Sequence, residues 1–344
     1  MAIGFISCET DIKVNADPTD ITVVYGLIDP ADTVHYLKIN KAFLGEGSAL
    51  DLANNADNYN YSDSELNVRI DGNGKSYSLT RVINEVTKDA GIFDNSTNVL
   101  YKFNEPLINL DATYNLKIVN TQLNKEITSS TKIVGNSIVE APKKSNTLSF
   151  WSGNVSTGNG VSEAVTIIAG DNVGRIQAFL VFNYIENYTT ASGLAPVSKK
   201  VLLNLGEKKI AGDSDSKLNF LVKGQNFMDN IKENVSNPST IANFSHRELA
   251  NISIELSVAG SELSTYMEAK APSTTVNQDK PNYTNLINGI GIFSSRSYDS
   301  SWQSNKTAST GLNMDTDTKR YLASLGLGFC LGTNTTATSP CNQL

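Results

Sequence analysis

Hydrophobic and polar residues alternate along short runs in the first third of the chain, which is the pattern of β-strands with one buried face. Residues 33–44 show it clearly, with Leu37 and Ile39 on one face. The four residues from Asp71 to Gly74 accept positive backbone φ, so they predict a hairpin between two strands. Seven strands are predicted in this region, at residues 21–28, 33–44, 66–70, 76–82, 99–103, 113–119 and 126–134.

Strands at this spacing predict an immunoglobulin-like Greek-key sandwich over residues 21–135. A polar stretch at 136–147 is interpreted as a linker, and residues 148–344 as a second β-rich domain. Longer strands are predicted there, at 174–187, 200–205, 217–222 and 251–258. Apolar residues at helical spacing predict short helices, at 226–235, 261–269 and 315–325. The fold class is therefore mostly β, with two or three short helices in the second domain.

The chain opens on a short apolar run that ends in Ser7 and Cys8. This is the pattern at the end of a lipoprotein signal, and residues 9–20 are polar, as a spacer would be. We therefore interpret residues 1–20 as a truncated signal and spacer, with a lipid on Cys8. The other two cysteines, Cys330 and Cys341, are predicted to form a disulfide, because an even remainder in an exported protein favours pairing. The alternative is that all three cysteines are unrelated buried or free thiols, with neither a lipid nor a disulfide.

The amino-acid composition limits the classes of partner that the protein can bind. The formal net charge is −7 over 344 residues, which argues against a nucleic-acid partner, since phosphate binding needs a clustered basic face. The same acidity opposes adhesion to an anionic lipid surface, so the lipid anchor is the predicted membrane contact. The longest apolar stretches are also too short to span a bilayer.

Catalytic signatures are scarce in this sequence. His35 is predicted to be a core or edge histidine, and His246 to lie in a polar turn. Nucleotide-binding, zinc-protease and EF-hand motifs are missing, so we expect no metal, no cofactor and no enzymatic activity. Three carboxylate pairs could in principle serve a glycosidase, although their spacing is typical of solvated loops: Asp213 with Asp215, Asp315 with Asp317, and Asp63 with Glu65.

Two groups of residues are candidates for recognition. The long polar loop at 46–64 carries Asp57 and Asp63 around Tyr59 and Tyr61, and such a loop can clamp a cationic or sugar-like partner. The alternative is a disordered insertion. The second group consists of candidate exposed aromatic residues that could stack on sugars or anchor an interface, and the alternative is partial burial. These residues are Trp151, Tyr188 and Trp302.

Three stretches resemble a family of Bacteroidota surface lipoproteins that are often encoded beside TonB-dependent outer-membrane transporters. They are residues 5–11 around Cys8, the strand pair at 23–30 and 35–41, and the glycine-bearing segment at 285–295 that follows Tyr266. The resemblance implies an immunoglobulin-like N-terminal domain, a β-rich C-terminal domain and display on the outer membrane. It implies no established enzymatic activity, and it assigns no catalytic residues.

We therefore expect a surface lipoprotein that acts as a binding or accessory component beside a transporter in nutrient capture, with a glycan or peptide ligand. The first alternative is an adhesin or pilus-type subunit that assembles by adding a strand to an exposed sheet edge. The second is a carbohydrate-active enzyme that uses one of the carboxylate pairs.

The lipid anchor predicts that Cys8→Ser moves the protein from the membrane to the soluble fraction, because a serine cannot carry the thioether-linked lipid. Membrane fractionation and intact mass spectrometry measure this. Cys341→Ser is the matched control and should stay with the membrane. A wild-type protein that is soluble and has no acyl chains would contradict the prediction.

Overall fold

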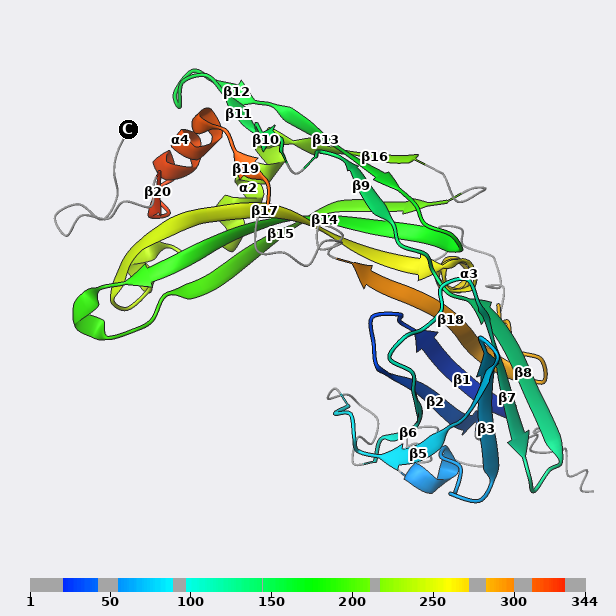
Figure 1. Ribbon diagram of the computed structural model, residues 1–344. Coiled ribbons are helices and arrows are strands. Elements are labelled where there is room, and N and C mark those ends of the chain that lie inside the picture. The colour runs from blue at the N-terminus through cyan, green and yellow to red at the C-terminus, as the bar shows by residue number, and fades with distance from the viewer. Residues whose placement is uncertain are drawn as a thin grey trace, which may run out of the picture.

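The computed structural model describes residues 21–42, 55–88, 97–143, 145–210, 217–271, 283–299 and 311–331. Strand outweighs helix, 54% to 15%, which confirms the predicted mostly β fold. Figure 1 shows two parts, a sandwich formed mainly by the N-terminal strands and a long twisted sheet built by the later ones. Within the described residues, none of the helices has the length and apolar character needed to cross a membrane.

The N-terminal part is a two-layer sandwich. One layer has the order β1 (Ile21–Ile28), β2 (Val34–Ala42), β6 (Val99–Asn104) and β5 (Thr80–Ile83). The other has the order β4 (Lys75–Ser78), β3 (Leu66–Gly72), β7 (Thr113–Asn120) and β8 (Lys125–Lys132). This is the strand arrangement of immunoglobulin domains, as predicted. The predicted strand at 76–82 is in fact two strands in different layers, because the chain crosses over at Leu79, whose N–H donates to Val68 O (2.9 Å).

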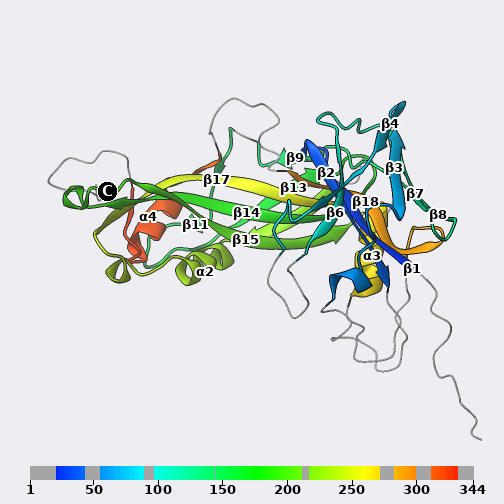
Figure 2. The same ribbon diagram turned by 90° about the horizontal axis from the view of Figure 1, so that it is seen from below.

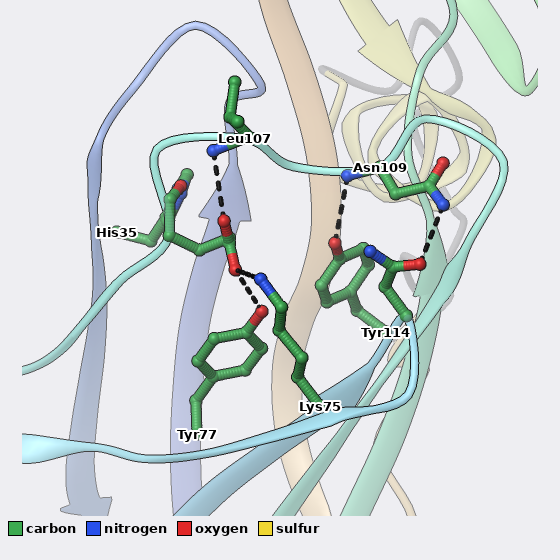
Figure 3. A network of polar contacts seen from close by, with 8 residues as sticks. His35, Lys75, Tyr77, Leu107, Asn109 and Tyr114 are labelled. Atoms are coloured by element: carbon green, nitrogen blue, oxygen red, sulfur yellow. Dashed lines mark hydrogen bonds and ion pairs between the residues drawn. The ribbon is translucent and has the colours of Figure 1, made fainter.

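A tyrosine corner fixes the turn into β7. Tyr114 is fully buried, and its hydroxyl accepts a hydrogen bond from the Asn109 N–H at 3.1 Å. The Asn109 side chain donates in turn to Asn73 Oδ1 at 2.9 Å, which ties this loop to the β3–β4 hairpin (Figure 3). A tyrosine at this position is a hallmark of immunoglobulin-like sandwiches.

Glu105 holds the start of the same loop through contacts with Lys75, Tyr77 and Leu107, which Figure 3 labels. Its buried carboxylate accepts hydrogen bonds from Lys75 Nζ (2.7 Å), from the Tyr77 hydroxyl and from the Leu107 N–H (3.2 Å). The hydrogen bonds from Lys75 and Tyr77 lower the pKa of Glu105 to about 2, because they favour the ionised form. His35 Nε2 lies 3.1 Å from Glu105 O, and its ring is buried against a phenylalanine, as expected for a core histidine.

The C-terminal part is built on a long sheet. Its strands are β15 (Val197–Lys209), β14 (Val173–Tyr188) and β17 (Phe244–Gly260), and a smaller sheet of β16 (Lys217–Lys223), β13 (Ser162–Ile168) and β9 (Ile138–Ala141) shares its core. Helices α2 (Gly224–Asn234) and α4 (Thr316–Ser324) contribute to that core, and α3 (Ser261–Lys270) follows β17. All three predicted helices are present. The short elements are η1 (Ala56–Asn58), β10 (Thr147–Leu148), β11 (Trp151–Ser152), β12 (Asn159–Gly160), η2 (Thr190–Ser192), η3 (Pro238–Thr240), β19 (Asn313–Met314) and β20 (Phe329–Cys330).

The two parts share one strand, β18 (Gly289–Asp299). Residues 289–295 pair in parallel with β1, and residues 296–299 pair antiparallel with β17. The main sheet therefore runs without a break from β15 to β5, and Phe293 of β18 lies in the sandwich core. The sequence had placed all of 148–344 in the second domain, whereas this strand belongs to both parts. Figure 2 shows α3 beside β1 and β18 at the junction.

Gly291 lets β18 approach β1. Its φ is +115°, a conformation that favours glycine, and a Cβ at this position would lie 2.0 Å from Val24 O. A side chain here would push the two strands apart.

We expect Gly291→Ala to destabilise the protein by more than the about 1–3 kcal/mol of backbone strain alone, because the clash with Val24 O adds to it. Chemical denaturation measures the change. Gly193→Ala is the matched control, since Gly193 also has positive φ (+68°) but no atom within 4 Å of an added Cβ. Equal losses in the two variants would contradict the assigned role of Gly291.

The lowered pKa of Glu105 predicts a pH dependence. Ionised Glu105 stabilises the folded state above the usual glutamate pKa, and this contribution is lost as pH falls through about 4.5 toward about 2. Thermal melts of wild type and Glu105→Gln should therefore differ most near neutral pH and converge toward pH 2. Glu140→Gln, at an exposed ion pair with Lys217, is the control and should show little difference at any pH.

Candidate functional site

A cavity of about 430 Å³ lies where the sandwich meets the long sheet. It is bordered by β14, β15, β17 and β18, by helix α3, and by the end of β1 with the turn after it. We call it the junction cavity. Its lining comes from segments that are far apart in the sequence and that meet because β18 joins the two parts.

Strand pairing places two arginines on either side of the cavity floor. Arg175 of β14 pairs with Ala259 of β17, and Ala259 pairs with Arg296 of β18, so all three side chains project from the same face. Strands lie about 4.8 Å apart, so the two arginine Cα atoms are roughly 10 Å apart with a methyl group between them. The neighbouring row of side chains on this face also has a small residue in the middle, since Ser257 lies between Gln177 and Tyr298. The small side chains on β17 leave the space that the arginines flank.

Each arginine has a carboxylate beside it. Arg175 Nη1 lies 2.5 Å from Glu207 Oε1, and Arg296 Nε lies 4.0 Å from Asp29 Oδ2. The Asp29 side chain is only 10% exposed, and its Oδ1 accepts a hydrogen bond from the Ala31 N–H at 3.0 Å. Burial raises the pKa of Asp29, because removing the carboxylate from water disfavours its charge. The cavity therefore presents two positive and two negative groups.

The remaining wall is apolar. Leu27 comes from β1, and Leu263 and Met267 come from α3. The helix is fixed over the sheet by two hydrogen bonds, one from the Leu263 N–H to Ser294 Oγ (3.2 Å) and one from Ser264 Oγ to a β14 carbonyl (3.3 Å). Met267 is 41% exposed, so part of this apolar wall is in contact with solvent. The arrangement suits a ligand with polar ends and an apolar side.

The predicted binding loop at 46–64 is only partly described, from residue 55 onward. Tyr61 is buried at 1% exposure, and its hydroxyl is 2.9 Å from Thr22 Oγ1, so it packs into the sandwich and cannot clamp a partner. This corrects its assignment as a recognition residue. Tyr59 is half-buried, whereas Asp57 and Asp63 are exposed.

The predicted exposed aromatics are also less accessible than expected. Trp151 is 7% exposed and stacks on Tyr321 with ring centroids 3.7 Å apart, so it belongs to the core. Tyr188 is half-buried, and its hydroxyl donates to Glu186 at 3.0 Å. Trp302 lies outside the described residues. Neither Trp151 nor Tyr188 lines the junction cavity.

A buried ion pair lies at the far end of the long sheet. Arg247 is fully buried, and its Nη2 and Nε donate to Glu186 Oε2 at 2.8 and 3.1 Å. Its Nη1 donates to Leu327 O, which ties the segment before β20 to the sheet. The sequence had placed neighbouring His246 in a polar turn, which is wrong, because His246 lies within β17 and is 3.3 Å from Glu248. These contacts satisfy buried charge and serve the fold.

The carboxylate pairs considered for catalysis have structural roles or are not described. Asp315 caps α4 by accepting from the Thr318 N–H at 2.8 Å, and Asp317 accepts from the Gly153 N–H at 2.9 Å. Glu65 accepts from the Ser62 N–H, while Asp213 and Asp215 lie outside the described residues. Within the described part of the chain, His, Cys, Asp and Glu side chains form no cluster able to hold a metal ion.

Cys330 is buried in β20 and is disulfide-bonded. Its predicted partner, Cys341, lies outside the described residues, as does Cys8, so the pairing and the lipid anchor stay predictions.

Comparison with known proteins matched no family model and found no similar curated protein.

Proposed function

We propose that the protein is a non-enzymatic binding lipoprotein of the outer membrane surface, which captures a small ligand and passes it to a TonB-dependent transporter. The junction cavity carries the proposal. Its volume and its mixture of apolar wall and few charged groups are those of small-molecule binding sites. The lipid anchor and the transporter partner are supported by the sequence around Cys8 and by the family resemblance.

The chemistry of the lining supports binding. Among the described residues that line the cavity there is neither a histidine nor a cysteine, the side chains most often used as a base or a nucleophile. Glu207 is paired with Arg175, and Asp29 lies beside Arg296. Charged groups of both signs in one cavity can hold a ligand that carries charges of its own.

The adhesin alternative requires an open sheet edge. The outer strand of the main sheet, β15, is such an edge, but it carries lysines, which natural sheets use to oppose strand addition. Lys200 pairs with Glu255 (3.2 Å), and Lys209 pairs with Glu268 (2.5 Å). These lysines oppose the addition of a further strand to β15.

Filling the junction cavity tests the proposal. Fractions of a peptide digest and of a polysaccharide hydrolysate are added to the full-length protein, and thermal unfolding is followed. We expect at least one fraction to raise the Tm of wild type and not that of Ser257→Trp, because the indole occupies the cavity floor between Gln177 and Tyr298. Ser198→Trp, at an exposed position of β15, is the matched control and should respond like wild type.

If a fraction stabilises Ser257→Trp and wild type equally, the ligand binds outside the junction cavity. If no fraction stabilises the wild type, the proposed binding function is wrong.

The transporter is tested separately by affinity capture from outer membranes with the lipidated protein. We expect a TonB-dependent transporter to be retained, and its absence would overturn that part of the proposal.

A further inference from the structure

We infer that the junction cavity binds a zwitterion with an apolar side chain, meaning an α-amino acid or a short peptide with free termini. This inference rests on the proposed binding function and gives it a ligand class. Three features of the cavity carry it: the two arginines, the two carboxylates and the apolar wall.

The arginines form the carboxylate end of the site. Arg175 and Arg296 flank Ala259, whose methyl group leaves the floor open between them. A guanidinium can bind a carboxylate through two parallel hydrogen bonds. Arg296 is well placed for this, because its Nε is 4.0 Å from Asp29, beyond hydrogen-bonding distance, and its side chain is 56% exposed.

Asp29 forms the ammonium end. Asp29 lines the cavity, its side chain is largely withdrawn from water, and the Arg296 guanidinium lies 4.0 Å from its carboxylate. A buried carboxylate gains most from a cation that reaches it closely, because the low local dielectric strengthens the interaction. A ligand ammonium group entering the cavity supplies that cation, and Glu207 adds a second negative group on the β15 side.

The apolar wall receives the side chain of the ligand. Leu27 lines the cavity from the sandwich side, and Leu263 and Met267 line it from α3. Methionine adapts to side chains of different shape, which suits a site that accepts several apolar residues. Burying an apolar side chain here contributes binding free energy that the charges alone do not supply.

The charge balance of the cavity selects against other ligands. A ligand with only a carboxylate meets two carboxylates at close range, and a ligand with only an ammonium group meets two arginines. A neutral sugar displaces water from the charged groups and supplies no charge of its own in return. A zwitterion places its carboxylate near the arginines and its ammonium group near the carboxylates.

Calorimetric titration of the full-length protein tests the inference with five probes. These are leucine, the dipeptide Leu-Leu, leucinamide, 4-methylpentanoate and maltose. We expect leucine or Leu-Leu to bind, and leucinamide and 4-methylpentanoate to bind at least about tenfold more weakly, because each lacks one charge-assisted interaction.

Two variants assign the ends of the ligand. Asp29→Asn should weaken zwitterion binding about tenfold and leave the affinity for 4-methylpentanoate unchanged or higher. Arg296→Gln should weaken zwitterion binding similarly and leave the affinity for leucinamide unchanged or higher. Arg69→Gln, which removes an arginine from an exposed ion pair with Asp71 on β3, is the matched control and should bind like wild type.

The outcomes separate this inference from the function on which it rests. If maltose binds to wild type and not to Ser257→Trp, the inference of a zwitterionic ligand is wrong, but the cavity is still a binding site. Single-charge probes that bind as tightly as leucine would also overturn the inference. If no probe binds and no nutrient fraction stabilises the protein, both the inference and the proposed function fail.

Discussion

The structure depends on the double pairing of β18. Its first seven residues hydrogen-bond to β1 of the sandwich, and its last four to β17 of the long sheet, so one backbone strand holds the two parts in a fixed relation. Close approach of β18 to β1 requires Gly291, where no side chain fits beneath Val24 O. Arg296 and Tyr298 lie at the junction because β18 continues past the sandwich.

Local sequence patterns predicted much of the fold because they report which face of each element is buried. The run Ile21–Ile28 is a strand with the predicted bounds, and helices α2, α3 and α4 fall where apolar residues recur at helical spacing. The immunoglobulin-like order followed from strand spacing and from turn residues such as Asn73 and Gly74, both of which have positive φ. Each of these signals is contained within a few neighbouring residues.

Long-range features could not be predicted in the same way. The parallel pairing of β1 with β18 joins the first described strand to one much later in the chain, and alternation within either strand does not specify this partner. The junction cavity depends on the register that aligns Arg175, Ala259 and Arg296 across three strands, which alternation within one strand does not specify. Arg247 is fully buried although arginine rarely is, and its burial depends on distant Glu186, which no local pattern indicates. Tyr61 and Trp151 were misplaced for a similar reason, since an aromatic residue in a polar segment gives no local sign of what covers it.

The place of β18 in the chain also has a kinetic consequence. Synthesis proceeds from the N-terminus, so β1 emerges long before the strand that covers its outer edge. Contacts between residues so distant in sequence form slowly, because a long loop must close first. During that interval β1 offers an unpaired edge to other chains, the kind of surface through which partly folded proteins aggregate. Protection of the β1 edge until residues 289–295 arrive would therefore favour the yield of folded protein.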